Sequence, residues 1–571
     1  MRQLFPIVNW LKTYNKLKFK DDFFAGLTIG VMIVPQGMAY AMLVGLPPIH
    51  GLYASTIPLI IYALLGSSRH VSVGPVALVS LLAASGISAM ANIGTNEFIM
   101  LAILLALIVG LIQILLGVLK LGFLVNFLSH PVMAGFTTAA AIIIAFSQLK
   151  HILGLDVSRG KVHEIIHNVY LNAADINGIT LLIGATTILL ILAIRRFNKQ
   201  IPSPLIVVFL GAGAVSVFGL HDLGVEIIRD VPSGFPSFEI PALTFSRFQQ
   251  LLPIAFTIAL VSFMESYTVA KAIQRKHNNY EVVANQELIA LGASNVGGAF
   301  FQSFPISGGF SRTAVNDQLG SKTGVSSIIS AGIVILTLLY LTEYFYYLPN
   351  AVLGGIIVVA VFSLINVKEA QHLWKKDKLD FSAFIITAIS TLIWGVEAGI
   401  GVGVVFSIIL VMYKASYPHI AELGQVPNST EYRNNNRFNN LKTYDDILIF
   451  RFDAQLFYAN AEALKKFVLK KLSICKNINH VILEASVINY LDSSAVYMLY
   501  DLNRLLKASD VNFIMTDVKG PVRDILSKNG LQDEHAFIRF ELTTKDAVDF
   551  IQSNQNANNR EYVFESLRNK L

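Results

Sequence analysis

Long apolar runs alternate with short polar connections over the first 420 residues of the chain. The runs lie at about 23–43, 98–119, 131–149, 177–194, 203–219, 252–272, 286–302, 324–341, 349–365, 379–395 and 397–413, with further short ones between them. Most approach the ~20 residues that an α-helix needs to cross a bilayer. The pattern predicts a polytopic α-helical membrane protein of about 14 spans, seven before a polar loop at 220–249 and seven after it.

The two halves of this region place polar and helix-breaking residues at corresponding points. The first span of each half carries a polar residue, Gln36 in one half and Glu265 in the other. Two spans later, each half has a short segment broken by Gly74-Pro75 or by Gly308-Gly309. Corresponding broken segments indicate a transport site between inverted repeats. Because an odd number of spans inverts the second copy, we expect 7+7 inverted repeats with two short half-helices.

The segment that follows Gly308-Gly309 has the chemistry of an anion site. Ser311 and Arg312 lie in the first turn of a predicted helix. A helix that begins inside a membrane presents free N–H groups and about half a positive charge at its N-terminus. An Arg near the centre of a span costs at least about 2.5–3.5 kcal/mol, so it should face protein or water. Taken alone, the segment could equally be a surface loop with a solvated Arg312.

Composition agrees with a membrane protein. Hydrophobic residues make up 54% of the chain and charged residues 14%, against roughly 25% charged in a soluble domain. The net charge of +6 is assigned to cytoplasmic loops rather than to nucleic-acid binding. The single cysteine, Cys475, excludes an intrachain disulfide. Because histidines are scattered and no nucleophile–base arrangement is evident, we expect no enzyme activity, no metal site and no cofactor.

Charge and composition also divide the chain into regions. Lys and Arg gather in the connections that are inside when the N-terminus is inside, which predicts cytoplasmic termini. We expect an integral protein of a bacterial inner (plasma) membrane. The expected regions are a cytoplasmic lead-in at 1–20, a transmembrane domain at 21–420 (repeats at about 21–219 and 250–420), a linker at 421–440 and a small cytoplasmic α/β domain at 441–571.

Several motifs together resemble those of one family, the SulP-type inorganic anion permeases with a C-terminal STAS domain. The matching segments are Pro35-Gln36-Gly37-Met38-Ala39-Tyr40, Pro48-Ile49-His50-Gly51-Leu52-Tyr53, Gly66-Ser67-Ser68-Arg69, Ser72-Val73-Gly74-Pro75, Met264-Glu265-Ser266 and Gly308-Gly309-Phe310-Ser311-Arg312-Thr313. The chain departs from the family at His50, where Tyr is usual. The resemblance implies core and gate domains that move like an elevator, an anion held between two short helices, and a homodimer.

The roles expected at the site follow from the residue types. Backbone N–H groups of Val76, Ala77, Ser311 and Arg312, with the Ser311 hydroxyl, should replace the water around the anion. Gln36 and Tyr40 should line the same pocket.

Glu265 is the candidate for ion coupling. A buried carboxylate favours its protonated form unless a cation is close, which would give H⁺ symport. Alternatively, a Na⁺ could bind Glu265 and Thr268. A third reading is a fixed Glu265–Arg312 ion pair that only holds the fold together.

The loop Asn489-Tyr490-Leu491-Asp492-Ser493-Ser494-Ala495 resembles the Asp-Ser-Ser-Gly loop of STAS domains, with Ala495 in place of Gly. Ser494 matches a serine that is phosphorylated in some of the related antagonists of anti-sigma factors. The plainer reading is that Asp492 and Ser493 cap a helix. A cytoplasmic regulatory protein could bind this domain.

The predicted function is secondary active transport of a small inorganic oxyanion, with sulfate expected and H⁺ or Na⁺ as co-transported ion. Alternatives are Na⁺-driven bicarbonate or dicarboxylate transport. A different class is a membrane-anchored regulatory or sensor protein whose output is the STAS domain.

Overall fold

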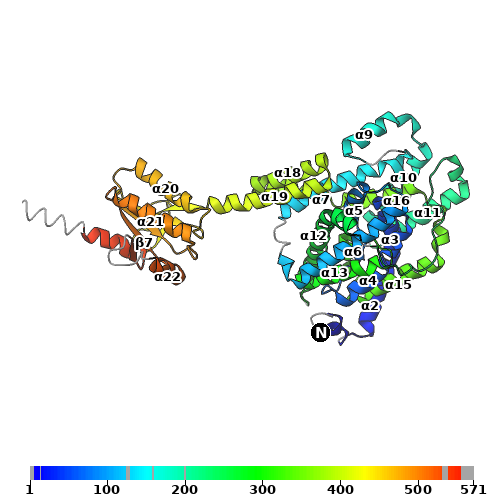
Figure 1. Ribbon diagram of the computed structural model, residues 1–571, viewed down its shortest axis with the longest axis horizontal. Coiled ribbons are helices and arrows are strands. Elements are labelled where there is room, and N and C mark those ends of the chain that lie inside the picture. Colours follow the sequence, from blue (N-terminus) through cyan, green and yellow to red (C-terminus); the bar gives the residue numbers. More distant parts are fainter. Residues whose placement is uncertain are drawn as a thin grey trace, which may run out of the picture. The chain divides into compact units, whose positions relative to one another are not determined.

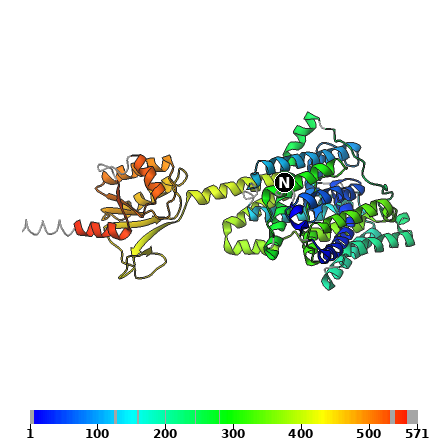
Figure 2. The ribbon, with the colours of Figure 1, turned by 90° about the horizontal axis from the view of Figure 1, so that it is seen from below.

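The computed structural model describes residues 6–12, 14–123, 129–156, 160–198, 201–242, 244–278, 280–529 and 538–554. The chain forms two compact units, Met1–Ser407 and Ile408–Leu571 (Figures 1 and 2). Each unit has its own hydrophobic core: one core lies among the helices of the first unit, and two smaller clusters lie on the sheet of the second.

The first unit is built from helices whose bounds follow the apolar runs. Its first half contains α1 (Ile7–Leu11), α2 (Lys16–Val44), α3 (Ile49–Tyr53), α4 (Ile57–Leu65), α5 (Ala77–Ser88), α6 (Asn96–Val118), α7 (His130–Ser147), α8 (Leu149–Leu153), α9 (Val162–Leu171), α10 (Gly178–Phe197) and α11 (Ser203–Phe218). Its second half contains α12 (Phe245–His277), α13 (Ala284–Ala299), α14 (Phe310–Gln318), α15 (Val325–Tyr340), α16 (Asn350–Phe362), α17 (Val367–Lys376), α18 (Lys378–Trp394) and α19 (Val396–Ser416). Among the described residues, seven helical segments are long and apolar enough to cross a membrane.

Two short helices of the first unit, α5 and α14, begin at the predicted breaks. α5 has 12 residues and α14 has 9. Each follows a two-residue strand, β1 (Val73–Gly74) or β2 (Ser307–Gly308), and the two strands pair antiparallel. Gly74 has a φ of +149°, a conformation that residues with a side chain rarely adopt. The breaks therefore join the two halves of the unit at one point.

Close helix packing in this unit depends on glycine at the crossing of α6 and α13. A methyl group placed on Gly110 would lie 2.6 Å from the carbonyl oxygen of Gly292. A methyl group on Gly292 would lie 2.7 Å from the carbonyl oxygen of Gly110. Small residues allow backbones to approach in this way inside membranes, where apolar surface alone gives little drive for helix association.

The second unit is a mixed sheet covered by helices (Figure 1). Its strand order is β4-β3-β5-β6-β7-β8, with β5 to β8 parallel and β3 and β4 antiparallel. The elements are β3 (Ile420–Gln425), β4 (Tyr432–Asn434), β5 (Ile447–Phe452), α20 (Ala461–Ile474), β6 (His480–Glu484), α21 (Ser493–Lys507), β7 (Asn512–Thr516), α22 (Gly520–Lys528) and β8 (Arg539–Glu541). Alternate residues of β5 enter the two clusters on opposite faces, as strand geometry requires.

Residues 421–440 differ from the linker that the sequence suggested. Most of β3 and all of β4 lie in this range, and both strands belong to the sheet. Ala421 and Leu423 alternate as buried residues on β3, but two apolar positions beside an Asn-rich stretch are too few to indicate a strand. The turn between the two strands contains Pro427 and Asn428, residue types that are common in turns.

Candidate anion-binding site

The antiparallel pair of β1 and β2 brings the N-terminal ends of α5 and α14 together. Val73 pairs with Gly308, and Gly74 pairs with Ser307. The N–H of Gly309 also donates to the carbonyl oxygen of Ser72, at 2.9 Å. The two breaks predicted from the sequence thus form one structure.

Neither half-helix has a side chain that caps its N-terminus. Val76 precedes α5 and Gly309 precedes α14, and neither position makes a side-chain cap bond. The first N–H groups of both helices therefore remain available to a ligand. Val76 and Ala77 are buried, whereas Ser311 is exposed. Ser311 can therefore meet an anion that approaches from solvent.

The side chain of Arg312 lies between these two helix ends. It is 2% exposed, and its Nη1 donates to the carbonyl oxygen of Pro75 at 2.8 Å. Nε and Nη2 are buried and have no hydrogen-bond partner among the described residues. A methyl group on Gly309 would lie 2.8 Å from Nη2, and one on Gly74 would lie 3.4 Å from it. A buried guanidinium thus keeps two nitrogen atoms free beside both glycines.

Gln36 and Tyr40 lie on α2, which packs against both α5 and α14. Both side chains are buried. Tyr40 is close enough to Arg312 and Glu265 for an electrostatic interaction with each. Since residues four apart share one face of a helix, Gln36 and Tyr40 point to the same side of α2. Their role in lining the pocket stays a prediction.

Glu265 lies on α12, which packs against both β2 and α14. Its Oε2 is buried and has no hydrogen-bond partner in the described part of the chain. Glu265 interacts electrostatically with Arg312, but the free atoms of the two side chains are not hydrogen-bonded to each other. The fixed ion pair considered above does not explain these unpaired atoms.

Thr268 does not join Glu265 at the site. The buried face of α12 runs through Ser262, Ser266, Val269 and Ile273, and Thr268 falls outside it and is exposed. A Na⁺ site that uses both Glu265 and Thr268 is therefore not preformed.

Sequence reasoning missed the polar side chains that hold β2 in place. Ser266 Oγ accepts from Gly308 N at 2.7 Å and lies 3.1 Å from Ser307 Oγ. Ser307 Oγ donates to the carbonyl oxygen of Ser262 at 2.9 Å, and Asn295 Oδ1 accepts from Ile306 N at 2.9 Å. A Ser or Asn inside an apolar run could have indicated these contacts, because such a residue within a membrane usually hydrogen-bonds to a partner.

Two buried carboxylates form hydrogen bonds with loops at the ends of other helices. Glu287 accepts from Tyr62 Oη at 2.6 Å, from Ser67 N and Oγ, and from Ser68 N. Asp22 accepts from Lys322 N, Thr323 N and Thr323 Oγ1. Glu287 thereby gives a structural reason for Ser67 and Ser68 in the motif Gly66-Ser67-Ser68-Arg69.

The remaining motif residues have local roles. His50 is buried and its Nδ1 lies 3.0 Å from the carbonyl oxygen of Gln302, so it connects α3 to the turn after α13. In the second unit, Asp492 Oδ1 accepts from Ala495 N at 2.8 Å and caps α21. Ser494 is exposed in the first turn of that helix. The capping role explains the presence of Asp492 in this loop and does not require phosphorylation of Ser494.

Comparison with known proteins agrees with the fold. The profile of the sulfate permease family matches residues 19–387, and that of the STAS domain matches residues 439–547. Sulfate transporter 4.1, chloroplastic, from Arabidopsis thaliana is 37% identical over 575 residues, covering 96% of this chain and 83% of that protein. High affinity sulfate transporter 2 from Stylosanthes hamata is 32% identical over 572 residues, covering 96% of this chain and 86% of that protein.

A solved structure with the same architecture is that of the murine Solute Carrier 26 family member A9 anion transporter in the inward-facing state. It superposes with a TM-score of 0.88 at 27% identity and covers 96% of this chain and 94% of its own. The relatives are transporters and not enzymes. The chain therefore belongs to the sulfate permease family and is a membrane-embedded anion transporter with a C-terminal STAS domain.

Proposed function

We propose that this protein is a secondary active transporter of sulfate. The observation that carries the proposal is the buried guanidinium of Arg312, whose Nε and Nη2 lack partners among the described residues. Buried donors without acceptors cost free energy, and a tetrahedral oxyanion supplies acceptors in several directions. The similarity to curated sulfate transporters from two plants supports sulfate as the anion.

The proposed pocket holds the anion between the two half-helices. The N–H groups of Val76, Ala77, Ser311 and Arg312 and the Ser311 hydroxyl replace water around its oxygens. Gln36 and Tyr40 close the pocket on the side of α2. Because the helix ends add partial positive charge to that of Arg312, the site favours an anion over a neutral solute.

Glu265 is the proposed coupling residue, and H⁺ is the proposed co-transported ion. Its Oε2 has no hydrogen-bond partner among the described residues, so a proton there does not break an existing bond. A protonated Glu265 repels the incoming anion less than a charged one does. The exposure of Thr268 weakens the case for Na⁺, because an Na⁺ ion in this place would lack one of its expected ligands.

Elevator-like alternating access is the proposed transport motion. The helices pack in two groups. In the first group α2 packs against α15, and α6 packs against α13. In the second group α7 packs against α18, and α10 packs against α16. A cavity of about 330 Å³ lies between the groups, lined by Leu43, Leu81, Ala84, Ile143, Thr391 and Val396 among others. A largely apolar boundary with spare volume supports sliding of one group against the other.

The proposed organisation keeps both termini in the cytoplasm and pairs two chains as a homodimer. The transport domain occupies about residues 21–420 and the STAS domain residues 441–571, with β3 and β4 completing its sheet. Light scattering of the purified protein in detergent measures the mass of the assembly directly. A mass of one chain would contradict the dimer.

The test of transport is uptake of radiolabelled sulfate and, separately, bicarbonate into proteoliposomes of the purified protein. A proton gradient and a Na⁺ gradient are imposed in turn on wild type, Arg312→Ala and Glu265→Gln. Arg247→Ala is the matched control, since Arg247 lies outside the pocket and pairs with Glu97 at 3.1 Å. We expect sulfate uptake driven by the proton gradient in the wild type and in the control.

The variants separate binding from coupling. Arg312→Ala should lower sulfate uptake by at least about tenfold, because a charge-assisted hydrogen bond contributes roughly 1.5–3 kcal/mol. Glu265→Gln should retain sulfate exchange and lose the response to the gradient. Unchanged uptake in folded Arg312→Ala would place the site elsewhere. Uptake of bicarbonate with a Na⁺ gradient, or no flux of either anion, would favour the alternative substrate or a regulatory role.

A further inference from the structure

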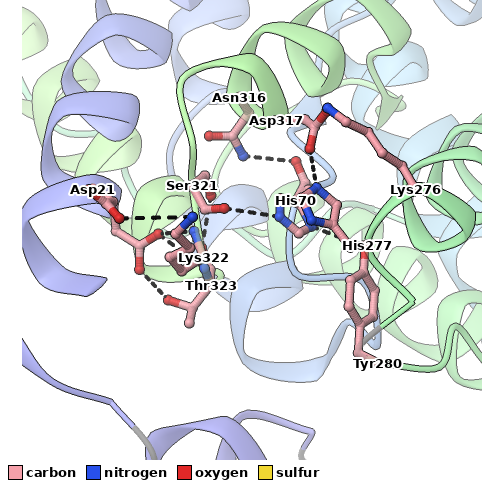
Figure 3. Close-up of polar contacts among 11 residues, drawn as sticks. Asp21, His70, Lys276, His277, Tyr280, Asn316, Asp317, Ser321, Lys322 and Thr323 are labelled. Atoms are coloured by element: carbon pink, nitrogen blue, oxygen red, sulfur yellow. Dashed lines mark hydrogen bonds and ion pairs between the residues drawn. The ribbon is translucent and has the colours of Figure 1, made fainter. Parts of the chain in front are cut away.

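A second polar cluster lies beyond the anion pocket, at the opposite end of α14 from Arg312 (Figure 3). His70 comes from the segment between α4 and β1, His277 is the last residue of α12, and Asp317 is on α14. One potential ligand atom from each of the three lies within 4.8 Å of the other two. The imidazole rings are stacked, with centroids 4.7 Å apart and planes 10° apart. The fold thus gathers three ligand-type side chains that are far apart in the sequence.

We propose that His70, His277 and Asp317 bind a transition-metal ion of the Zn²⁺ class. Two imidazoles and one carboxylate form a ligand set that suits Zn²⁺ and leaves a fourth position for water or another ligand. Mg²⁺ and Ca²⁺ prefer oxygen ligands alone, so the two imidazoles select against them. The sequence analysis expected no metal site, because the three positions have no recognisable ligand spacing.

His70 is already oriented as a ligand. Its Nε2 lies 3.0 Å from the carbonyl oxygen of Ser321, and since a carbonyl only accepts, Nε2 carries the proton. Nδ1 therefore offers its lone pair and accepts from Tyr280 Oη at 3.0 Å. A backbone carbonyl that holds the outer N–H of a histidine is the usual support of a metal ligand. For Nδ1 to bind a metal ion, the Tyr280 hydroxyl must turn away from it.

His277 and Asp317 complete the cluster from two other elements. His277 Nε2 contacts Asp317 Oδ1 directly, so these two atoms already point at each other. Asp317 Oδ2 accepts from Lys276 Nζ at 2.5 Å. Asp317 is buried, whereas the Lys276 side chain is 60% exposed and can move into solvent. The charge of Lys276 competes with a metal ion for the same carboxylate. Substitution of Lys276 should therefore change the affinity for the metal ion.

The site joins elements that also carry the proposed transport residues. α12 bears both Glu265 and His277, and α14 bears both Arg312 and Asp317. An ion bound at the cluster would connect these two helices at the end away from the pocket. The binding test below does not depend on which anion is transported.

The first test is titration of the full-length, metal-free protein in detergent with Co²⁺, followed by absorbance, and with Zn²⁺, followed by calorimetry. We expect one site whose affinity falls by at least about tenfold in His277→Ala and in Asp317→Asn. His372→Ala is the control, because His372 is exposed on α17 and outside the cluster. Equal Zn²⁺ affinity in wild type, His277→Ala and Asp317→Asn would overturn the proposal.

The second test increases affinity, so it does not depend on a variant that fails to fold. Lys276→Gln removes the competing charge and leaves all three ligands in place. We expect tighter Zn²⁺ binding, by several-fold, and a Co²⁺ spectrum with the same bands as wild type. An unchanged or weaker affinity in folded Lys276→Gln would exclude Asp317 from the site.

Discussion

Because Gly309 has no side chain, the guanidinium of Arg312 can occupy the space beside it. A methyl group at Gly309 would lie 2.8 Å from Nη2 and 2.9 Å from Cζ of Arg312, closer than such atoms pack. We expect Gly309→Ala to push the guanidinium out of the pocket and to weaken sulfate binding by about tenfold, the cost of one charge-assisted hydrogen bond. The sulfate dependence of uptake into proteoliposomes measures the change.

A glycine in open space is the control for this substitution. A methyl group on Gly213, in α11, meets nothing within 4 Å. Gly213→Ala should therefore leave sulfate affinity unchanged. Equal affinity in Gly309→Ala and wild type would show that the position of the Arg312 guanidinium does not determine binding.

Asp453 is a residue of the second unit whose charge should matter to stability. Its carboxylate accepts from Arg451 Nε at 2.5 Å and lies 2.8 Å from His419 Nδ1. Burial opposes the charge, but the hydrogen bonds from Arg451 and His419 outweigh it and hold the pKa of Asp453 below its usual range. A lowered pKa means that the stabilisation is present above about pH 4 and is lost as the pH falls through the pKa of the folded state.

Hydrogen exchange can measure this effect in the full-length protein. We expect Asp453→Asn to speed amide exchange in β3 and β5 at pH 7, consistent with a loss of about 1 kcal/mol. The difference from wild type should shrink as the pH falls through the lowered pKa of folded Asp453. Asp445→Asn is the control, because Asp445 is exposed. A difference that persists at low pH would mean that the carboxylate charge is not the cause.

At the residue level, the sequence predicted that Arg312 faces protein or water, because a charge in an apolar segment must be sheltered, and its side chain is buried in the protein. The sequence placed Thr268 beside Glu265 at the site, but Thr268 is exposed. It gave no indication that His70, His277 and Asp317 lie together. Only the assembled fold brings those three side chains together.

At the level of elements, the pairing of β1 and β2 depends on the hydroxyls of Ser266 and Ser307. Ser266→Ala removes the acceptor of Gly308 N, and Ser307→Ala removes the donor to Ser262. Each change should lower the melting temperature of the purified protein and the rate of sulfate uptake, because a buried group left unpaired costs about 1–3 kcal/mol.

The double variant tests whether the two serines act together. Since Ser266 Oγ and Ser307 Oγ lie 3.1 Å apart, their effects should not add, and Ser266→Ala/Ser307→Ala should be less impaired than the sum. Ser85→Ala serves as the control, because Ser85 is on α5 beside the apolar cavity and not at β2. Strict additivity would show that the serines stabilise β2 independently.

Helices were predictable where apolar length alone determines them. The runs expected at 177–194 and 203–219 correspond to α10 (Gly178–Phe197) and α11 (Ser203–Phe218). Strands β1 and β2 have two residues each, too few for any periodic pattern. They exist because each is the partner of the other, and Arg312 reaches Pro75 across 237 residues of sequence. β3 and β4 escaped prediction for the same reason, since β3 depends on its pairing with β5, and β4 on its pairing with β3.

At the level of the whole molecule, the chain forms two units with separate cores. The proposed anion site lies entirely in the first unit. We therefore expect a chain that lacks residues 421–571 to retain sulfate binding that is sensitive to Arg312→Ala, even if its uptake is slower. Binding of radiolabelled sulfate to the purified, truncated protein is the measurement. Complete loss of binding in a folded truncation would favour the regulatory reading.

The pairing of Val73 with Gly308 has a consequence for biosynthesis. The ribosome makes β1 and inserts the neighbouring helices long before it reaches β2. Until the later segment arrives, the start of α5 has no partner strand and the pocket has only one wall. Every chain interrupted before residue 308 is therefore born without a binding site, however well its first helices enter the membrane. The proposed pocket can therefore form only after β2 has been synthesised, when both halves of the unit are present.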